Sequence, residues 1–181
     1  MKISNKNKII ILIFLLGINI YPQSIKEQTI DIIKLQFGDN LNIESVKYEI
    51  PLKIKNEVEK EAQQHFYSEV VYIFKINRSD SLISTGILDN VYGKSMLITF
   101  LVLFDLNGEI ILTDIVKYRE PYGGGIKIKR WNDQFKRKNS KSKFKVGEDI
   151  DSISGATISV RSVTKGIQKL TLLFEKIKNK I

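Results

Sequence analysis

The feature that most constrains the fold is a change in the spacing of apolar residues along the chain. From Glu69 onward apolar and polar residues alternate, and β-branched and aromatic residues are frequent, which is typical of β-strands. The turn sequence Asp105–Gly108 predicts a tight hairpin between the last two strands. The sequence therefore predicts an antiparallel meander of about four strands. These strands are expected at residues 70–76, 82–91, 95–104 and 109–118.

Helical spacing is found on both sides of the meander. After Thr157 apolar residues recur every three or four positions as far as Ile177, which predicts a long amphipathic C-terminal helix. We expect an α+β fold, an antiparallel β-meander packed with helices. Shorter helices are expected at residues 24–37, 51–66 and 126–136, the last with Ile128, Trp131 and Phe135 directed inward, and residues 41–50 read as a further strand-like segment.

Composition excludes several functions. The 181 residues suffice for one domain with a substantial core but not for two full domains. The net charge of +9 is spread along the chain and no nucleic-acid-binding module is recognisable, so nucleic-acid binding is disfavoured. The absence of cysteine excludes disulfides, thiolate metal sites, Cys-ligated iron–sulfur clusters and a lipoprotein anchor. The single histidine, His65, is expected to be a partly buried packing or capping residue.

The N-terminus has the pattern of a signal peptide. Three lysines and no acid occur in the first eight residues, and an apolar run follows from Ile9 to Ile20. This run suits the core of a signal peptide, whereas a transmembrane helix needs about 20 residues. We expect export with cleavage near Ser24, and an uncleaved membrane anchor is the alternative. The predicted organisation is a signal peptide at residues 1–23, a helix–strand–helix segment at 24–80 and a domain at 81–181.

The stretch from Asp151 to Thr157 (DSISGAT) stands directly before the C-terminal helix. Gly155 and Ala156 would let backbone N–H groups approach a phosphate, and Thr157 supplies a hydroxyl for a phosphoester. Ser154 or Asp151 is expected to cap the helix. A phosphate there would meet free N–H groups and the positive end of the helix dipole. The same residues also fit a plain capping turn that binds nothing.

A second loop of small residues follows the last predicted strand. Glu120 opens it, and a glycine triplet, Gly123, Gly124 and Gly125, closes it. Without a following lysine–hydroxyl pair the triplet is not a P-loop, so it is either a flexible turn or a place where backbone approaches a ligand. The densest group of basic residues comes next and is expected to be a solvated face. It comprises Lys127, Lys129, Arg130, Lys136, Arg137 and Lys138.

Together these segments resemble the FMN-binding domain of the flavin-carrying subunits of sodium-pumping NADH:quinone reductase and Rnf complexes. The resemblance covers about residues 81–170. In that family an ApbE-type flavin transferase links the FMN phosphate to the last hydroxyl of the motif, which corresponds here to Thr157. The family often has a Glu-Thr-Pro-Gly-type loop near the flavin, whereas Pro121 directly follows Glu120 in this chain, so contacts of that threonine do not carry over.

The resemblance implies covalent FMN on Thr157. It further implies that Asp151, Ser154, Gly155 and Ala156 form the loop that the transferase recognises, and that Glu120 and Gly123, Gly124 and Gly125 line the flavin ring. The expected function is an exported, periplasmic or secreted, electron carrier. Its partners would be the transferase and redox donor and acceptor proteins, membrane-bound ones among them. Two alternatives stay open: a flavin-dependent reductase of a small acceptor, and a binding module that has lost its flavin.

Overall fold

The computed structural model describes residues 23–181, so nearly all of the signal peptide predicted at residues 1–23 lies outside the described range. Among the described residues no helix is both long and apolar enough to cross a membrane. The elements, in chain order, are α1 (Ile25–Phe37), β1 (Asn42–Glu49), α2 (Leu52–Ala62), β2 (Val70–Arg78), β3 (Ser81–Tyr92), β4 (Leu97–Phe104), β5 (Ile110–Tyr118), η1 (Gly124–Lys127), α3 (Lys129–Asn132), η2 (Asp133–Phe135) and α4 (Thr157–Ile177).

The strands form one antiparallel sheet in the order β1-β2-β3-β4-β5. The predicted meander is present, and β1 extends it to five strands because it pairs with β2 along its whole length. The predicted hairpin turn is also present: the Asp105 N–H donates to the Glu109 carbonyl at 2.9 Å. The boundary expected at residue 81 falls at the β2–β3 turn, and the sheet continues across it, since Arg78 pairs with Ser81.

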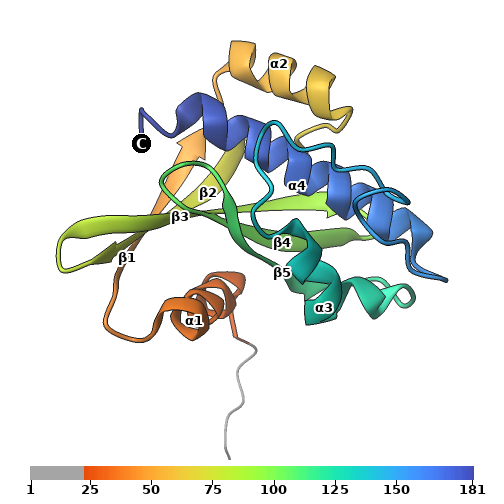
Figure 1. Ribbon diagram of the computed structural model, residues 1–181, viewed down its shortest axis with the longest axis horizontal. Helices are drawn as coiled ribbons and strands as arrows, with labels where there is room; N and C mark the ends of the chain where they lie inside the picture. The colour runs from red at the N-terminus through yellow and green to blue at the C-terminus, as the bar shows by residue number, and fades with distance from the viewer. Residues whose placement is uncertain (1–22) are drawn as a thin grey trace, which may run out of the picture.

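Helices cover both faces of this sheet (Figure 1). α4 and α2 lie on one face, where Val163 and Ile167 of α4 belong to the same buried cluster as Phe100 of β4. α1 lies on the other face and buries Ile33 in a second cluster with Leu101. β4 is therefore apolar on both sides, which explains its nearly continuous hydrophobic sequence, LITFLVLF. The α+β prediction is confirmed.

Two sequence-based expectations about single side chains are wrong. Trp131 and Phe135 are buried as predicted, but Ile128 is exposed and Ile126 occupies the inward position. The reason is that residues 124–127 form a 3₁₀ turn, whose period differs from that of the predicted α-helix. His65 is exposed rather than partly buried, because α2 ends at Ala62 and His65 lies in the connection beyond it.

The close packing of α4 on the sheet depends on Gly166. A Cβ at this position would lie 2.7 Å from Val91 Cγ1 and 2.8 Å from Phe100 Cζ. Alanine favours a helix over glycine by about 1 kcal/mol, but overpacking a core costs about 1–3 kcal/mol. We expect Gly166→Ala to lower the free energy of unfolding, by roughly 1–2 kcal/mol in urea denaturation. Arg161→Ala on the exposed side of α4 is the control, and equal stability of both variants would contradict this account.

Candidate functional site

The start of α4, the loop after β5 and the β3–β4 turn meet at one end of the sheet. Between them lies an open pocket of about 210 Å³. Four of the sequence-predicted site residues line it, namely Glu120, Gly123, Gly155 and Ala156. The other predicted residues flank it along the chain without lining it. The remaining lining residues are Lys94, Ser95, Pro121, Tyr122, Ile158 and Ser159.

The glycine triplet packs directly on the motif before α4. Gly123 has a left-handed backbone with φ of +82°, and a Cβ there would lie 2.8 Å from the Tyr118 hydroxyl and 3.4 Å from Ala156 Cα. Both the backbone angle and the close approach require glycine. A Cβ on Gly125 would likewise lie 2.9 Å from Ile153 Cγ2. The two loops that the sequence singled out separately are therefore one structural unit.

The N-terminus of α4 has no side-chain cap. Its N-cap is Ala156, so the expectation that Ser154 or Asp151 caps the helix is wrong. The reason is the turn at Ser154–Gly155, which closes when the Ala156 N–H donates to the Ile153 carbonyl at 3.0 Å. Among the described residues no protein acceptor meets the N–H groups of the first helical turn, at positions 157 to 159. Three N–H donors and the positive end of a 21-residue helix are thus available to an anion.

The hydroxyl groups near this helix end differ in accessibility. Thr157 and Ser154 are exposed, whereas Ser159 is buried. The Ser159 hydroxyl shares a hydrogen bond of 3.1 Å with the hydroxyl of Tyr118, which also donates to the Tyr122 carbonyl. Ser159 therefore holds the glycine loop on the helix, while Thr157 presents a free hydroxyl beside the open N–H groups.

The other end of the motif is anchored through its backbone. The Trp131 Nε1–H donates to the Asp151 carbonyl at 2.9 Å, and the Asp151 N–H donates to Gln134 Oε1 at 2.7 Å. The Asp151 side chain itself is exposed. Trp131 is a core residue, as predicted, and it also fixes where the motif begins. Sequence reasoning missed Gln134, because nothing in its neighbourhood marks it as a partner of a residue 17 positions away.

Glu120 holds the β3–β4 turn against the pocket. Its carboxylate accepts from the N–H of Ser95 at 2.6 Å, from the N–H of Met96 at 2.8 Å and from the Ser95 hydroxyl at 3.0 Å. The Met96 and Ser95 N–H groups, in that order, keep the pKa of the Glu120 carboxyl below its usual value. This role for Glu120 was not visible in the sequence, which offers no sign that positions 95 and 120 meet.

We expect the turn to loosen when Glu120 loses its charge. Because the folded-state pKa is depressed, the contribution of the carboxylate is present above the unfolded pKa of about 4.3 and is lost as the pH falls through the folded-state value. At neutral pH, Glu120→Gln should speed hydrogen exchange of the Ser95 and Met96 amides by about tenfold. Glu148→Gln, which removes an exposed carboxylate bonded only to a lysine side chain, is the control. Unchanged exchange in Glu120→Gln would contradict the assignment.

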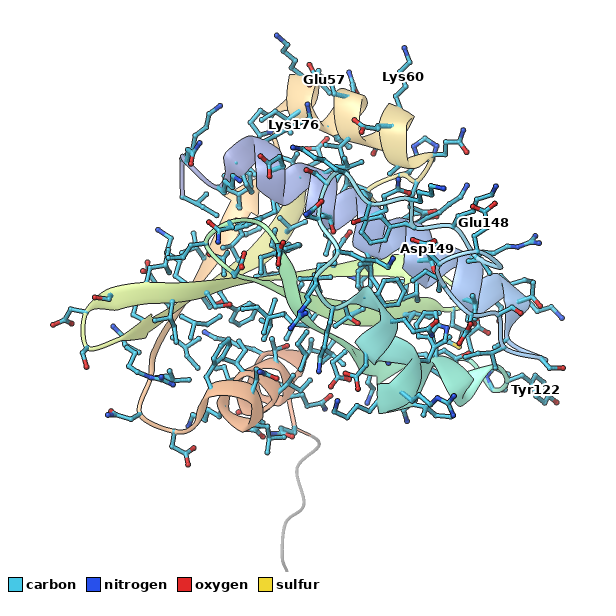
Figure 2. All side chains as sticks on the ribbon, in the orientation of Figure 1. Glu57, Lys60, Tyr122, Glu148, Asp149 and Lys176 are labelled. Carbon is cyan, nitrogen blue, oxygen red and sulfur yellow. The ribbon has the colours of Figure 1, made fainter. Side chains whose placement is uncertain are left out.

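Several pocket residues were not singled out by the sequence. Tyr122 and Ile158 stand at the rim with 81% and 49% of their surface exposed, and Figure 2 shows Tyr122 projecting outward from the loop after β5. Lys94 contributes the one lysine of the lining. The six basic residues after the glycine triplet are all described and none lines the pocket. Three of them pair with acids, Lys129 and Lys136 with Asp133 and Lys138 with Asp149.

Comparison with known families assigns this part of the chain. Residues 93–171 match the family model of the FMN-binding domain. This range starts in the β3–β4 turn, ends within α4 and contains every residue that lines the pocket. No curated protein matches the chain. Residues 93–171 therefore form a domain of the FMN-binding family, which supports a flavin-binding electron-transfer role.

The geometry fits such a cofactor. A phosphate at the start of α4 would accept from the free N–H groups at positions 157 to 159. The adjoining pocket is open, and its lining includes Gly123 and Gly155 and the exposed side chains of Tyr122 and Ile158. The chain thus provides a polar end for a phosphate and a less polar end for a ring.

Proposed function

We propose that this protein is an exported electron carrier that holds FMN covalently, through a phosphoester between the FMN phosphate and Thr157 Oγ1. The observation that carries the proposal is the combination at one helix end of an exposed threonine hydroxyl, three unpartnered N–H groups and a pocket inside a matched FMN-binding domain. Attachment forms the Oγ1–P bond and breaks one P–O bond of the phosphate, and the departing oxygen takes the hydroxyl proton, so the product equals the chain plus FMN less one water. When bound, FMN supplies one- and two-electron redox chemistry.

Each residue of the site has a distinct role in the proposed binding of FMN. The N–H groups at the start of α4 would hold the phosphate, and Gly123 brings the loop after β5 close enough to form the pocket wall. Tyr118 and Ser159 fix this loop on the helix, and Glu120 fixes the β3–β4 turn. An ApbE-type transferase would recognise the segment formed by Asp151, Ser154, Gly155 and Ala156, because all of these except Ala156 are exposed.

A carrier is favoured over a reductase by the chemistry of the pocket lining. Among the described residues the one carboxylate that lines the pocket is Glu120, and it already accepts hydrogen bonds from three donors of the β3–β4 turn. A general acid or base must be free to exchange a proton with the substrate. The pocket is also open rather than enclosed, which suits direct approach of a redox partner protein to the ring edge.

Export belongs to the same proposal. The lysines in the first eight residues and the apolar run that follows them support a signal peptide. Covalent attachment suits a compartment where free FMN is scarce and a dissociated cofactor would be lost. The partners would be the transferase during maturation and redox proteins afterwards, membrane-bound ones among them.

The deciding measurement is the intact mass of the protein produced in cells that also express an ApbE-type transferase. We expect a gain of one FMN less one water, mapped by peptide analysis to the segment that contains Thr157. Flavin fluorescence should stay with the chain after denaturation. The bare polypeptide mass under these conditions would overturn the proposal and leave the motif as a helix start without a cofactor.

A further inference from the structure

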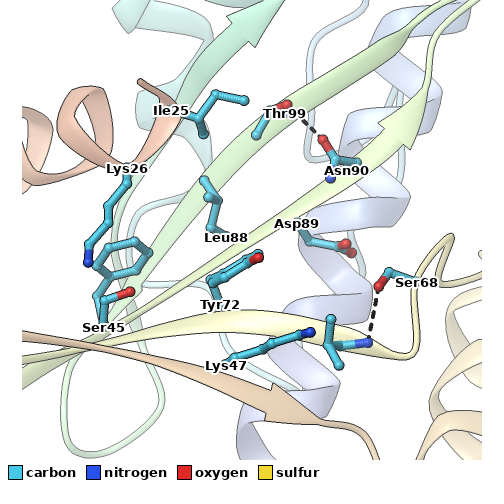
Figure 3. Close-up of a pocket in the computed structure, with 12 residues that line it drawn as sticks. Ile25, Lys26, Ser45, Lys47, Ser68, Tyr72, Leu88, Asp89, Asn90 and Thr99 are labelled. Atoms are coloured by element: carbon cyan, nitrogen blue, oxygen red, sulfur yellow. Dashed lines mark hydrogen bonds between the residues drawn. The ribbon is translucent and has the colours of Figure 1, made fainter. Parts of the chain in front are cut away.

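A second, larger cavity lies on the α1 side of the sheet (Figure 3). Its volume is about 640 Å³, within the range of about 300–1,000 Å³ that is usual for small-molecule sites. It shares no lining residue with the flavin pocket. The lining comes from the start of α1, from the connection before β2 and from strands β1 to β4, and it includes Lys26, Lys47, Tyr72, Leu88, Asn90 and Thr99.

The floor of the cavity is apolar and is built by the strand register. Tyr72 is paired with Leu88 across β2 and β3, and paired residues of neighbouring strands share one face of a sheet. Phe74, two positions beyond Tyr72 in the strand, lies on the same face, and Leu88 and Phe74 are both buried. Tyr72 stays 47% exposed, because α1 covers only part of this face. The apolar or aromatic part of a ligand could therefore pack against Tyr72, Phe74 and Leu88.

One wall carries a polar group with spare donors. The Thr99 hydroxyl donates to Asn90 Oδ1 at 2.7 Å and accepts from Arg119 Nη1 at 3.0 Å. This arrangement fixes the Asn90 amide with its oxygen toward Thr99. No acceptor for Asn90 Nδ2 is present among residues 23–181, so both of its N–H groups are available to a ligand. The group that Asn90 can bind is therefore a hydrogen-bond acceptor.

The charge of the cavity is positive. Lys26 comes from α1 and Lys47 from β1 (Figure 3), both are exposed, and neither takes part in an ion pair within the described part of the chain. The one acid in the lining is Asp89, which points to the opposite face of the sheet and pairs with Lys169 of α4 at 2.9 Å. Its charge is thus compensated outside the cavity.

We propose that this cavity is a second binding site, for a small organic anion with an aromatic or aliphatic body. The body would lie on Tyr72, Phe74 and Leu88, and the acidic group would accept hydrogen bonds from Asn90 and face the two lysines. Such a ligand would accept hydrogen bonds from Asn90 Nδ2 and would also compensate the charges of Lys26 and Lys47. A neutral or cationic ligand could do at most the first of these. The site does not depend on flavin attachment.

The test uses 8-anilinonaphthalene-1-sulfonate, an aromatic anion, in calorimetric titrations of the full chain with and without flavin. One saturable site is expected in both forms. Lys26→Gln/Lys47→Gln should weaken binding by about tenfold, whereas Lys141→Gln/Lys143→Gln, with the same charge change on exposed residues elsewhere, should change it less than about twofold. Ser45→Trp, which places a large ring in the cavity from an outer strand, should abolish binding while circular dichroism stays unchanged.

A neutral analogue separates charge from shape. N-phenyl-1-naphthylamine lacks the sulfonate, so its binding should be lost in Ser45→Trp but unaffected by Lys26→Gln/Lys47→Gln. Absence of a saturable site for the sulfonate would mean that the cavity is closed or already filled, and would overturn the proposal. Sulfonate binding that is undiminished in a folded Ser45→Trp protein would overturn the proposal as well. So would sulfonate binding that is unchanged in Lys26→Gln/Lys47→Gln.

Discussion

Thr157→Ala is expected to abolish covalent flavin completely. A phosphoester requires the Oγ1 atom, and alanine removes it while leaving the backbone N–H groups and the pocket in place. Thr157 is exposed and its side chain makes no hydrogen bond with the described residues, so stability should change by no more than about 0.5 kcal/mol. The measurement is the intact mass after co-expression with the transferase, together with the thermal midpoint to show that the fold is kept.

Two matched variants make this result specific. Ser152→Ala removes another exposed hydroxyl of the same loop, at a position outside the proposed recognition residues, and should keep the flavin. Thr157→Ser keeps a hydroxyl at the attachment position and should restore the mass gain. Covalent flavin on Thr157→Ala, or its loss from Ser152→Ala with Thr157 intact, would contradict the assignment of the acceptor.

The largest stability effect is expected at the buried ion pair between α4 and the sheet. Lys169 is fully buried, and its Nζ lies 2.9 Å from Asp89 Oδ2, 2.7 Å from the His65 carbonyl and 4.1 Å from the centre of the Phe66 ring. Burial raises the pKa of the Asp89 carboxyl and lowers the pKa of Lys169, and each partner opposes the shift of the other. Both charges are tolerated because they are paired.

Lys169→Met should therefore lower the free energy of unfolding by about 3–5 kcal/mol, since it leaves Asp89 buried without a countercharge. Asp89→Leu/Lys169→Met replaces the pair with apolar groups and should recover most of the loss. Lys176→Met is the control on the same helix: its pair with Glu57 spans 2.8 Å at the surface between α2 and α4 (Figure 2), where solvent screens it, so its loss should cost far less than loss of the buried pair. Urea denaturation of the four proteins measures these differences. Equal losses in Lys169→Met and Lys176→Met would show that burial does not set the strength of the pair.

The sequence by itself determined those parts of this protein that depend on local periodicity and on short motifs. Segments rich in β-branched and aromatic residues predicted the four strands of the meander, including β4, which does not alternate. The three- and four-residue spacing after Thr157 predicted α4, and Asp105–Gly108 predicted the hairpin. These predictions hold because backbone geometry imposes periods of 2 and 3.6 on the side chains. The motif ending at Thr157 likewise indicated the FMN-binding domain that the family comparison supports.

Only the tertiary structure decided which distant residues meet. The sequence did not show that Glu120 accepts hydrogen bonds from Ser95 and Met96, or that Asp89 pairs with Lys169. Nor did it show that α4 begins without a side-chain cap. It also did not show that α1 leaves a cavity beside Asn90. Each of these depends on how helices and strands are placed relative to one another. Contacts of this kind arise from packing in three dimensions, which local periodicity does not specify.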